Sequence, residues 1–509
     1  MHFAAENHAP IPTKDLLSWT FDDVKYDPDE PIYIDAKDPS KSISSNQARV
    51  LIRKLVAGLH AAAAGGIFAG TNPSYTQFEL IHHIKTAKTN FLITEPEMLQ
   101  NVLAAAKECS IPESKVWIFD VLDNPLPDGF KSWKDLLSHG EEDWVRFDDE
   151  KTCKETTAAR LFSSGTTGLP KAAMLSHYNF ISQHTLVHEY KKKAWNAGPP
   201  IAHTTPLRAG HVSVVLRRFE LEPFLSTIEK FKISEVGIVP PIVVAIIMSG
   251  LANKYSLDSI RLVSIGAAPL GKESQARLRQ LLPKGAFCNQ VWGMTEMSCI
   301  ASMFHYPEDD DTGSVGRMLP NLDAKLVDDN NNDITAYDTL GELCVRGPVV
   351  VKGYFDNPKA NAEAFDSEGF FKTGDIVYCD SKTKKWYVVD RKKELIKVRG
   401  FQVAPPELET VLLSHPHIVD AAVIGVKLPG DQVGEHPRAY CVKRPVKESE
   451  DLDEHGVKKW CGERLAKFKE LTGGVRFVQA IPKNASGKIL KRVLREEAKA
   501  ELDQDKPRL

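Results

Sequence analysis

The segment LFSSGTTGLPK, residues 161–171, follows a short apolar run from Ala158 to Phe162 that is typical of a β-strand. Its eleven residues include four hydroxyl side chains, two glycines and a lysine. Glycines let backbone N–H groups turn toward one anion, hydroxyls donate further hydrogen bonds, and Lys171 can neutralise phosphate charge. The segment therefore predicts a phosphate-binding loop whose spacing differs from that of the Walker loop. For the Ser-Ser-Gly piece alone, an ordinary surface turn would be the simpler interpretation.

Four further stretches follow the loop along the chain, namely residues 292–296 (WGMTE), 373–375 (TGD), 390–405 and 482–488. Together with the loop, and in this order, they resemble the ATP-dependent adenylate-forming enzymes, the family of acyl-CoA synthetases, 4-coumarate:CoA ligases and beetle luciferases. The resemblance covers most of the chain. It implies an α/β fold, with a large N-terminal body (residues 1–390) of layered α/β subdomains, mostly parallel sheets plus a small β-barrel-like part. A small mobile α+β lid (residues 391–509) would follow.

Length and composition agree with such a protein. A chain of 509 residues is expected to hold more than one domain, because single cores stop growing near ~250–300 residues. A formal net charge of −3 gives no electrostatic reason to expect nucleic acid as a partner. The eight cysteines are scattered without a CxxC pair, so neither a disulfide framework nor a zinc site is predicted.

The apolar runs of the chain bear on its location. None approaches the ~18–20 residues of a membrane span, and residues 1–20 lack the apolar core of a secretory signal. We therefore expect a cytoplasmic or peroxisomal protein. The ending Pro507-Arg508-Leu509 resembles a peroxisomal tripeptide, and a charged, frayed tail is the alternative interpretation. No fused carrier protein is expected.

Hydrophobic periodicity predicts the main elements. A helix should begin at a cap at Ser44 or Ser45, and a second should span Thr76 to Thr89. Strands are expected at 91–94, 116–119, 236–241 and 260–265, with a helix at 242–249 after the third of these. In the lid, a strand is expected at 394–397 and helices at 408–413 and 457–468.

Two segments that the family normally contains are expected to be missing. The first is a strand and a helix near Ala61 to Ala64, and the second is a strand after Pro200 that carries a histidine bordering the acyl pocket. His203 and His211 stand in other contexts and are not assigned that role. Either coding segments were skipped or the protein is a shortened family member, so an inactive relic is an alternative to an active enzyme.

The resemblance implies a nucleotide site. Glu296 would bind Mg²⁺, Thr295 would donate to the α phosphate, and Asp375, supported by Arg391, would accept hydrogen bonds from the ribose hydroxyls. Taken singly, the Thr-Glu pair would be read as a helix cap and TGD as an Asx turn. The other expected ATP-binding and AMP-binding residues are Ser163, Ser164, Gly165, Thr166, Thr167, Gly168, Lys171, Gly266, Ala267, Ala268, Trp292 and Gly293.

Lys488 resembles the family lysine that bridges the carboxylate and the α phosphate during adenylation. An ammonium group suits this role because both partners are anionic and repel each other as they meet. The lid would then turn about Lys393, withdraw Lys488 and present a second catalytic lysine, Lys397, to the thiol. Coenzyme A would contact Arg399, Gly400 and Gln402.

An apolar pocket would hold the acid. The expected lining residues are Val239, Ala267, Gly293, Cys299 and Ile300, and they suit a medium-chain or aryl acid. The predicted reaction is that of an ATP- and Mg²⁺-dependent acyl-CoA ligase: the acid and ATP form acyl-AMP, which CoA converts to the thioester. An adenylating enzyme with a different acyl acceptor is the nearest enzymatic alternative.

Overall fold

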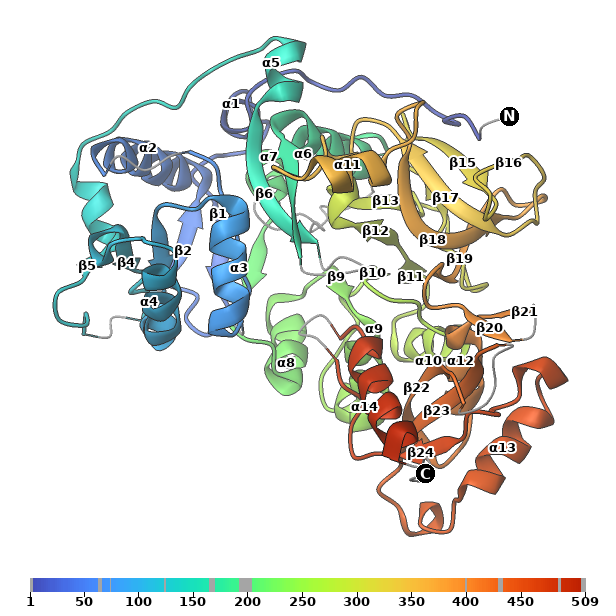
Figure 1. Ribbon diagram of the computed structural model, residues 1–509. Helices are drawn as coiled ribbons and strands as arrows, with labels where there is room; N and C mark the ends of the chain where they lie inside the picture. The colour runs from blue at the N-terminus through green and yellow to red at the C-terminus, as the bar shows by residue number, and fades with distance from the viewer. Residues whose placement is uncertain are drawn as a thin grey trace.

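The structure is a computed structural model of the chain (Figure 1). It describes residues 3–62, 66–73, 75–122, 125–163, 170–191, 204–398, 401–428, 434–483 and 487–504, without the side chains of 401, 402, 503 and 504. The chain forms several α/β and antiparallel layers up to about residue 391, and a smaller carboxyl-terminal part, orange to red in Figure 1, follows them.

A small parallel sheet lies in the amino-terminal part. Its strands are β3 (Leu92–Thr94), β4 (Val116–Ile118) and β5 (Lys131–Ser132), and its helices are α3 (Gln77–Ala87) and α4 (Leu99–Glu108). Leu80, Ile84, Ala105 and Ile118 form its buried core. The predicted helix at 76–89 is confirmed as α3, because Thr76 and Glu79 form a capping box at its start.

A second sheet joins segments that are distant in sequence. It contains β2 (Ser42–Ser44), β1 (Pro31–Asp35) and β8 (Ser213–Val215), and it lies near α1 (Leu16–Phe21), α2 (Ser45–Ala61) and α7 (Thr205–Ala209). The helix predicted from Ser44 is confirmed: Ser44 and Gln47 form a capping box at the start of α2.

A third sheet is wholly parallel. Its strands are β9 (Glu235–Ile238), β10 (Leu262–Ile265) and β11 (Phe287–Gln290), in the order β11-β10-β9. The helices α8 (Leu221–Phe231), α9 (Pro240–Ser249) and α10 (Lys272–Leu281) cover it around a core that includes Leu225, Val243 and Ile265. The strands predicted at 236–241 and 260–265 and the helix predicted at 242–249 are confirmed as elements. The helix begins earlier than expected, at Pro240, because proline fits the first turn of a helix.

Antiparallel strands form the remainder of the body. The strands β6 (Thr157–Ser163) and β7 (Lys171–Ser176) form an antiparallel hairpin. The helix α5 (Glu150–Glu155) precedes it, and α6 (His177–His184) and a π-helical turn (Thr185–Glu189) follow it. A three-stranded sheet contains β12 (Trp292–Met294), β13 (Cys299–Met303) and β14 (Arg317–Met318). A five-stranded sheet has the strand order β16 (Asp333–Ile334), β15 (Asp323–Val327), β17 (Gly341–Arg346), β18 (Phe371–Cys379) and β19 (Trp386–Arg391). The helix α11 (Pro358–Ala364) contacts β18.

The predicted combination of α/β layers and a β-rich part is therefore confirmed. The β-rich part consists of the two antiparallel sheets, which meet through backbone hydrogen bonds between Gly316 and Trp386 (2.8 Å) and between Val315 and Trp386 (2.9 Å). Among the strands in the described ranges, no barrel closes.

The carboxyl-terminal part has a sheet between two helical layers. The strands are β22 (Ile418–Val426), β23 (His436–Lys443) and β24 (Val475–Phe477), and a hairpin, β20 (Ile396–Val398) and β21 (Phe401–Val403), precedes them. The helices α12 (Pro405–Leu413) and α13 (Glu454–Gly462) pack on one face, and α14 (Lys491–Gln504) packs on the other. A boundary at residue 390 and mobility of this part stay predictions.

Two expected boundaries in this part are wrong. The strand expected at 394–397 begins at Ile396, because the N–H groups of Glu394 and Leu395 both donate to the Arg391 carbonyl and form a turn. The helix expected at 457–468 spans Glu454–Gly462 instead. Asp453 caps its start by accepting from the Gly456 N–H, and Ala466 has an extended backbone that prevents its continuation.

The first expected gap stays a prediction, because residues 63–65 lie outside the described part. Just beyond it, Phe68 pairs with Ala159 of β6 in a parallel bridge, and its side chain is 64% exposed.

All eight cysteines are free, as predicted. Within the described ranges, every helix is too short or too polar to cross a membrane.

We expect Gly58→Ala to destabilise the protein by about 1–3 kcal/mol, although alanine favours helices. A Cβ at Gly58 in α2 would lie 2.1 Å from the Leu136 carbonyl oxygen, and backbone cannot yield easily. Gly462→Ala in α13 is the matched control, since a Cβ there meets nothing within 4 Å. Urea unfolding of both variants measures the difference; equal stabilities would contradict this packing.

Candidate active site

The carboxyl ends of the third sheet form one wall of the site. Ile238, Ile265 and Gln290 are paired at the same level, so the residues that follow them emerge at one edge. Backbone hydrogen bonds continue this register, from Gly266 N–H to the Ile238 carbonyl (3.2 Å) and from Val291 N–H to the Ile265 carbonyl (2.8 Å). Ligands commonly bind at this edge of a parallel sheet. Val239, Gly266, Ala267, Ala268 and Trp292 are therefore brought together as expected from their positions.

Close packing explains the small residues of this wall. A Cβ at Gly293 would lie 1.7 Å from the Cys299 carbonyl oxygen, and a Cβ at Gly266 would lie 2.9 Å from the Val291 side chain. Ala267, Ser298 and Cys299 have positive φ angles of 71°, 56° and 130°. Non-glycine residues in this region are strained, and such strain is concentrated at functional sites. Ile300 is buried and Cys299 is exposed.

Asp375 is the central carboxylate. It lies opposite Arg391 in the β18–β19 register, and the Arg391 Nε is 3.3 Å from its Oδ1. The Trp292 indole N–H donates to its Oδ2 at 2.8 Å. Asp375 is only 4% exposed, and burial raises its pKa above the usual value while Arg391 and Trp292 oppose this shift. Sequence reasoning named all three residues but did not foresee the bond from Trp292.

Lys488 approaches this carboxylate from the far end of the sequence. Burial and the nearby Arg391 guanidinium lower the pKa of Lys488 to about 8, whereas Asp375 raises it. The preceding Gly487 has φ +78° and packs so closely on Pro241 at the start of α9 that a Cβ would lie 2.3 Å from its ring. The loop that carries Lys488 thus contacts the wall of the third sheet, and its amine lies within electrostatic reach of Asp375.

Glu296 lies in the short turn Thr295–Met297 between β12 and β13. Its carboxylate is buried, and Oε1 accepts a hydrogen bond of 2.7 Å from the Tyr354 hydroxyl. Its backbone carbonyl accepts from the Val351 N–H at 3.0 Å. A buried carboxylate beside a predicted phosphate loop has the oxygen chemistry that Mg²⁺ prefers.

The two ends of the predicted phosphate loop are described. Ser163 closes β6 and Lys171 opens β7, and the two residues are direct partners in the hairpin. The Lys171 Nζ lies 4.7 Å from the centroid of the Tyr354 ring. Ser164, Gly165, Thr166, Thr167 and Gly168 lie outside the described residues.

Tyr354 is a site residue that sequence reasoning missed. It follows Gly353 directly after the apolar stretch 349–351, and a lone aromatic in such a place usually belongs to a core. The Gly353-Tyr354 pair shortly after a buried apolar stretch was the available signal.

Of the residues expected to act in the thiol step, the structure describes Lys397 and the hinge residue Lys393. Lys397 is exposed on β20 and pairs with Gln402. Its N–H donates to Oε2 of Glu435 at 3.0 Å, and its carbonyl accepts from the Glu435 N–H at 2.8 Å. Lys393 lies in the turn after β19, with its Nζ 3.9 Å from Glu394, and burial lowers its pKa. Arg399, Gly400 and the side chain of Gln402 are outside the described residues, as is His203.

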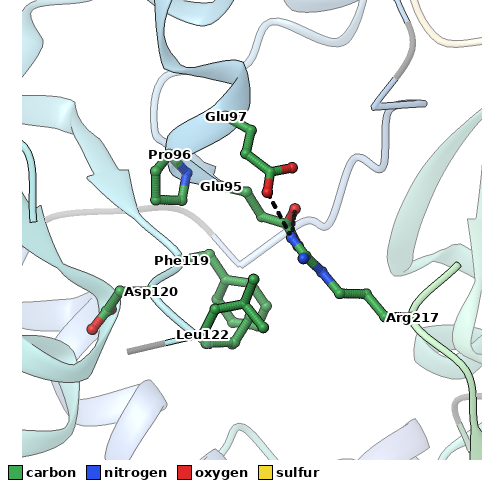
Figure 2. Close-up of a pocket in the computed structure, with 8 residues that line it drawn as sticks. Glu95, Pro96, Glu97, Phe119, Asp120, Leu122 and Arg217 are labelled. Atoms are coloured by element: carbon green, nitrogen blue, oxygen red, sulfur yellow. Dashed lines mark hydrogen bonds and ion pairs between the residues drawn. The ribbon is translucent and has the colours of Figure 1, made fainter. Parts of the chain in front are cut away.

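A small separate pocket lies at the carboxyl ends of β3 and β4 (Figure 2). Arg217 crosses it and pairs with Glu95 at 2.8 Å and Glu97 at 3.5 Å. Its charges are thus already compensated, and it contains none of the residues assembled around Asp375.

Fold and site together define a nucleotide-binding enzyme of two parts, in which a lysine from the carboxyl-terminal part reaches a buried carboxylate of the body. The family model described as AMP-binding enzyme matches residues 52–355, and the model of the AMP-binding enzyme C-terminal domain matches residues 407–488. The chain belongs to the AMP-binding enzyme family.

Several relatives extend this result. Phenylacetyl-CoA ligase epaB from Aspergillus niger is 49% identical over 97% of this chain and 98% of its own length. Acyl-CoA ligase azaF, also from Aspergillus niger, is 48% identical over 97% of this chain and 100% of its own length. The first match spans 536 positions, which exceeds the 509 residues of this chain, so the relative carries internal residues that this chain lacks.

A solved structure supports the arrangement of the two parts. ATP-bound MatB from Rhodopseudomonas palustris is 25% identical over 96% of this chain and 99% of its own, with a TM-score of 0.81. The apo form of MatB is 26% identical over the same shares and has a TM-score of 0.68. The present structure therefore resembles the ATP-bound arrangement more than the apo arrangement.

We expect Trp292→Phe to weaken AMP binding roughly tenfold. The substitution keeps an aromatic ring but removes the N–H donor, and a hydrogen bond to a charged group contributes about 1.5–3 kcal/mol. Isothermal titration calorimetry with AMP measures the change. Trp117→Phe, which removes the bond from a buried indole to the Ser114 carbonyl far from Asp375, is the control. Unchanged AMP affinity in Trp292→Phe would show that nucleotide binding does not depend on the hydrogen bond from Trp292 to Asp375.

Proposed function

We propose that this chain is an ATP- and Mg²⁺-dependent acyl-CoA ligase. A carboxylic acid and ATP would form acyl-AMP and pyrophosphate, and CoA would then displace AMP to give the acyl thioester. The observation that supports this most strongly is the approach of Lys488 to Asp375, since these groups are distant in sequence and both resemble nucleotide-binding residues of the family.

The chemistry requires charge compensation. A carboxylate is a poor electrophile, and its attack on the α phosphate brings two anions together. The Lys488 ammonium can neutralise both as they meet, and its partly buried position strengthens this interaction because little water screens it. Asp375, held by Arg391 and Trp292, would orient the ribose and so keep the α phosphate in reach.

Glu296 is the residue that would hold Mg²⁺, with phosphate oxygens completing the coordination. When bound, the cation supplies positive charge to the triphosphate and the leaving pyrophosphate. Ser163 and Lys171 would hold the β and γ phosphates, together with the loop residues between them, and Thr295 would donate to the α phosphate.

The thiol step needs a different arrangement. Lys488 occupies the approach to the adenylate, whereas Lys397 is exposed on the β20–β21 hairpin. Rotation about Lys393 would exchange them, bring Arg399, Gly400 and Gln402 to CoA, and admit the thiol.

The acid is proposed to be an aryl acid, with a medium-chain acid as the alternative. The apolar wall formed by Val239, Ala267, Gly293 and Ile300 suits either, and one relative is named for phenylacetate. A peroxisomal location through Pro507–Leu509 stays a prediction, because these residues lie outside the described part.

Two assays test the function. Acid-dependent exchange between pyrophosphate and ATP, over a panel of aryl and aliphatic acids, reports adenylation; product analysis with and without CoA identifies the acceptor. Exchange without thioester formation would favour a different acceptor. Folded protein that exchanges with no acid would favour the inactive relic, which the residues missing relative to epaB make a concrete alternative.

Lys488→Ala separates the two half-reactions. We expect pyrophosphate exchange to fall by about 10²–10³-fold, because a preorganised electrostatic contact is lost. Thioester formation from supplied acyl-AMP should stay within about threefold of wild type. If pyrophosphate exchange and thioester formation fell equally, the proposal that the carboxyl-terminal part takes one position for adenylation and another for the thiol step would be contradicted.

The pKa of Lys488 predicts the pH dependence. An amine is protonated below its pKa, so kcat/KM for exchange should be highest below about pH 8 and fall above it. Bound anions raise this pKa, so kcat should fall at a higher pH than kcat/KM. Lys488→Arg, if it retains activity, should lose this alkaline decline since guanidinium stays charged. A flat wild-type profile between pH 7 and 10 would contradict the assignment.

A further inference from the structure

Tyr354 joins two elements that are separate in sequence. Its hydroxyl donates a 2.7 Å hydrogen bond to Oε1 of Glu296, and the face of its ring lies 4.7 Å from the Nζ of Lys171. Tyr354 and Glu296 are each 5% exposed, so neither contact is weakened much by water. One side chain thus touches both the expected metal carboxylate and the expected phosphate lysine.

The backbone around Tyr354 is itself held firmly. The Tyr354 N–H donates to Oδ1 of Asn361 at 2.7 Å, and Nδ2 of Asn361 donates to the Tyr354 carbonyl at 2.9 Å. Gly353 has φ +132°, and a Cβ there would lie 2.8 Å from the same Oδ1. A tight turn and a side-chain clamp therefore fix the position from which the tyrosine extends.

The same segment is paired with the strand that follows the phosphate loop. The Phe355 N–H donates to the Ala172 carbonyl at 2.8 Å, and the Met174 N–H donates to the Gly353 carbonyl at 2.9 Å. Tyr354 and Ala173 form an isolated antiparallel bridge, so residues 353–355 lie along β7 next to Lys171. These bonds fix the backbone from which the ring extends.

We propose that Tyr354 is a positioning residue that sets the distance between the Glu296 carboxylate and the Lys171 ammonium for a metal–triphosphate complex. Its hydroxyl orients the carboxylate, and the electron-rich face of its ring holds the lysine stem at a constant place. This inference rests on the proposed function of the site and adds a residue that acts through two others without itself touching the reacting atoms.

A purely structural tyrosine would give a different result from a positioning one. Loss of a packing contact weakens all ligands of the site alike, whereas loss of the bond to Glu296 weakens those ligands that carry the cation. The test therefore compares ATP with Mg²⁺ against AMP without metal in the full chain, by isothermal titration calorimetry. Electron paramagnetic resonance with Mn²⁺ and ATP provides a second readout of the bound cation.

Tyr354→Phe removes the hydroxyl and keeps the ring. We expect its dissociation constant for Mg²⁺-ATP to rise roughly tenfold, because a hydrogen bond to a charged group is lost, and its affinity for metal-free AMP to stay within about twofold. Tyr354→Leu, which also removes the ring from Lys171, should weaken ATP binding further, including in the presence of a chelator.

Tyr440→Phe is the matched control. Tyr440 lies in the carboxyl-terminal part and is 1% exposed, and its hydroxyl donates to the Leu494 carbonyl at 3.3 Å. The variant therefore loses a buried hydrogen bond of a tyrosine hydroxyl in a different part of the protein from Glu296. Its affinities for both ligands should equal those of wild type, and preserved AMP binding shows that each variant is folded.

The outcomes are distinguishable. Selective loss of Mg²⁺-ATP affinity in Tyr354→Phe supports the positioning role. If Tyr354→Phe loses affinity for both ligands equally, or for neither, the positioning role is overturned. The proposed function then stays intact, provided that the wild-type protein binds Mg²⁺-ATP. Wild-type protein that binds AMP but not Mg²⁺-ATP would overturn the proposed function and this inference together.

Discussion

The structure depends on one constraint, that charges removed from water must be compensated. Asp375 is almost fully buried, and its two oxygens are held by Arg391 from the neighbouring strand and by Trp292 from another sheet. Because an isolated buried carboxylate is costly, these partners must stay in place whenever Asp375 is ionised. The five-stranded antiparallel sheet and the three-stranded sheet that contains β12 are thereby tied together at the point where a nucleotide would lie.

The carboxyl-terminal part adds the opposite charge. Lys488 is brought to Asp375 by a loop that packs on Pro241, and α14 beyond it covers one face of the terminal sheet. Across the junction between the parts, Lys392 is bonded to Glu342, and Ile376 of the body packs with Leu395 and Ala404 in a small apolar cluster. Small, partly polar interfaces of this kind are compatible with relative motion of the parts they join. An adenylating enzyme that must later admit a thiol needs such motion.

The residues that this chain lacks relative to longer relatives affect a different region. Phe68 and Ile67 border the first junction and are exposed, whereas Asp375, Glu296 and Lys488 lie in elements whose hydrogen bonds are intact. The expected nucleotide residues that the structure describes are therefore held in place. Loss of a histidine at the acyl pocket stays a prediction, because residues 192–203 lie outside the described part.

Much of this protein follows from the sequence by itself, because the signals are local. A hydroxyl side chain followed three residues later by Gln or Glu begins α2 and α3, a glycine-rich stretch follows a strand, and small residues follow β10. Each of these signals depends on neighbours in the chain. Local signals also misplaced two ends: the strand at Ile396 begins later than expected and α13 ends earlier, since a turn at Arg391 and the backbone at Ala466 decide them. Only the tertiary structure decided that Lys488 reaches Asp375, that Trp292 donates to the same carboxylate and that Tyr354 contacts both Glu296 and Lys171. These contacts join residues between 58 and 183 positions apart, and such distances are closed by sheet register and helix packing, which no short stretch of sequence encodes.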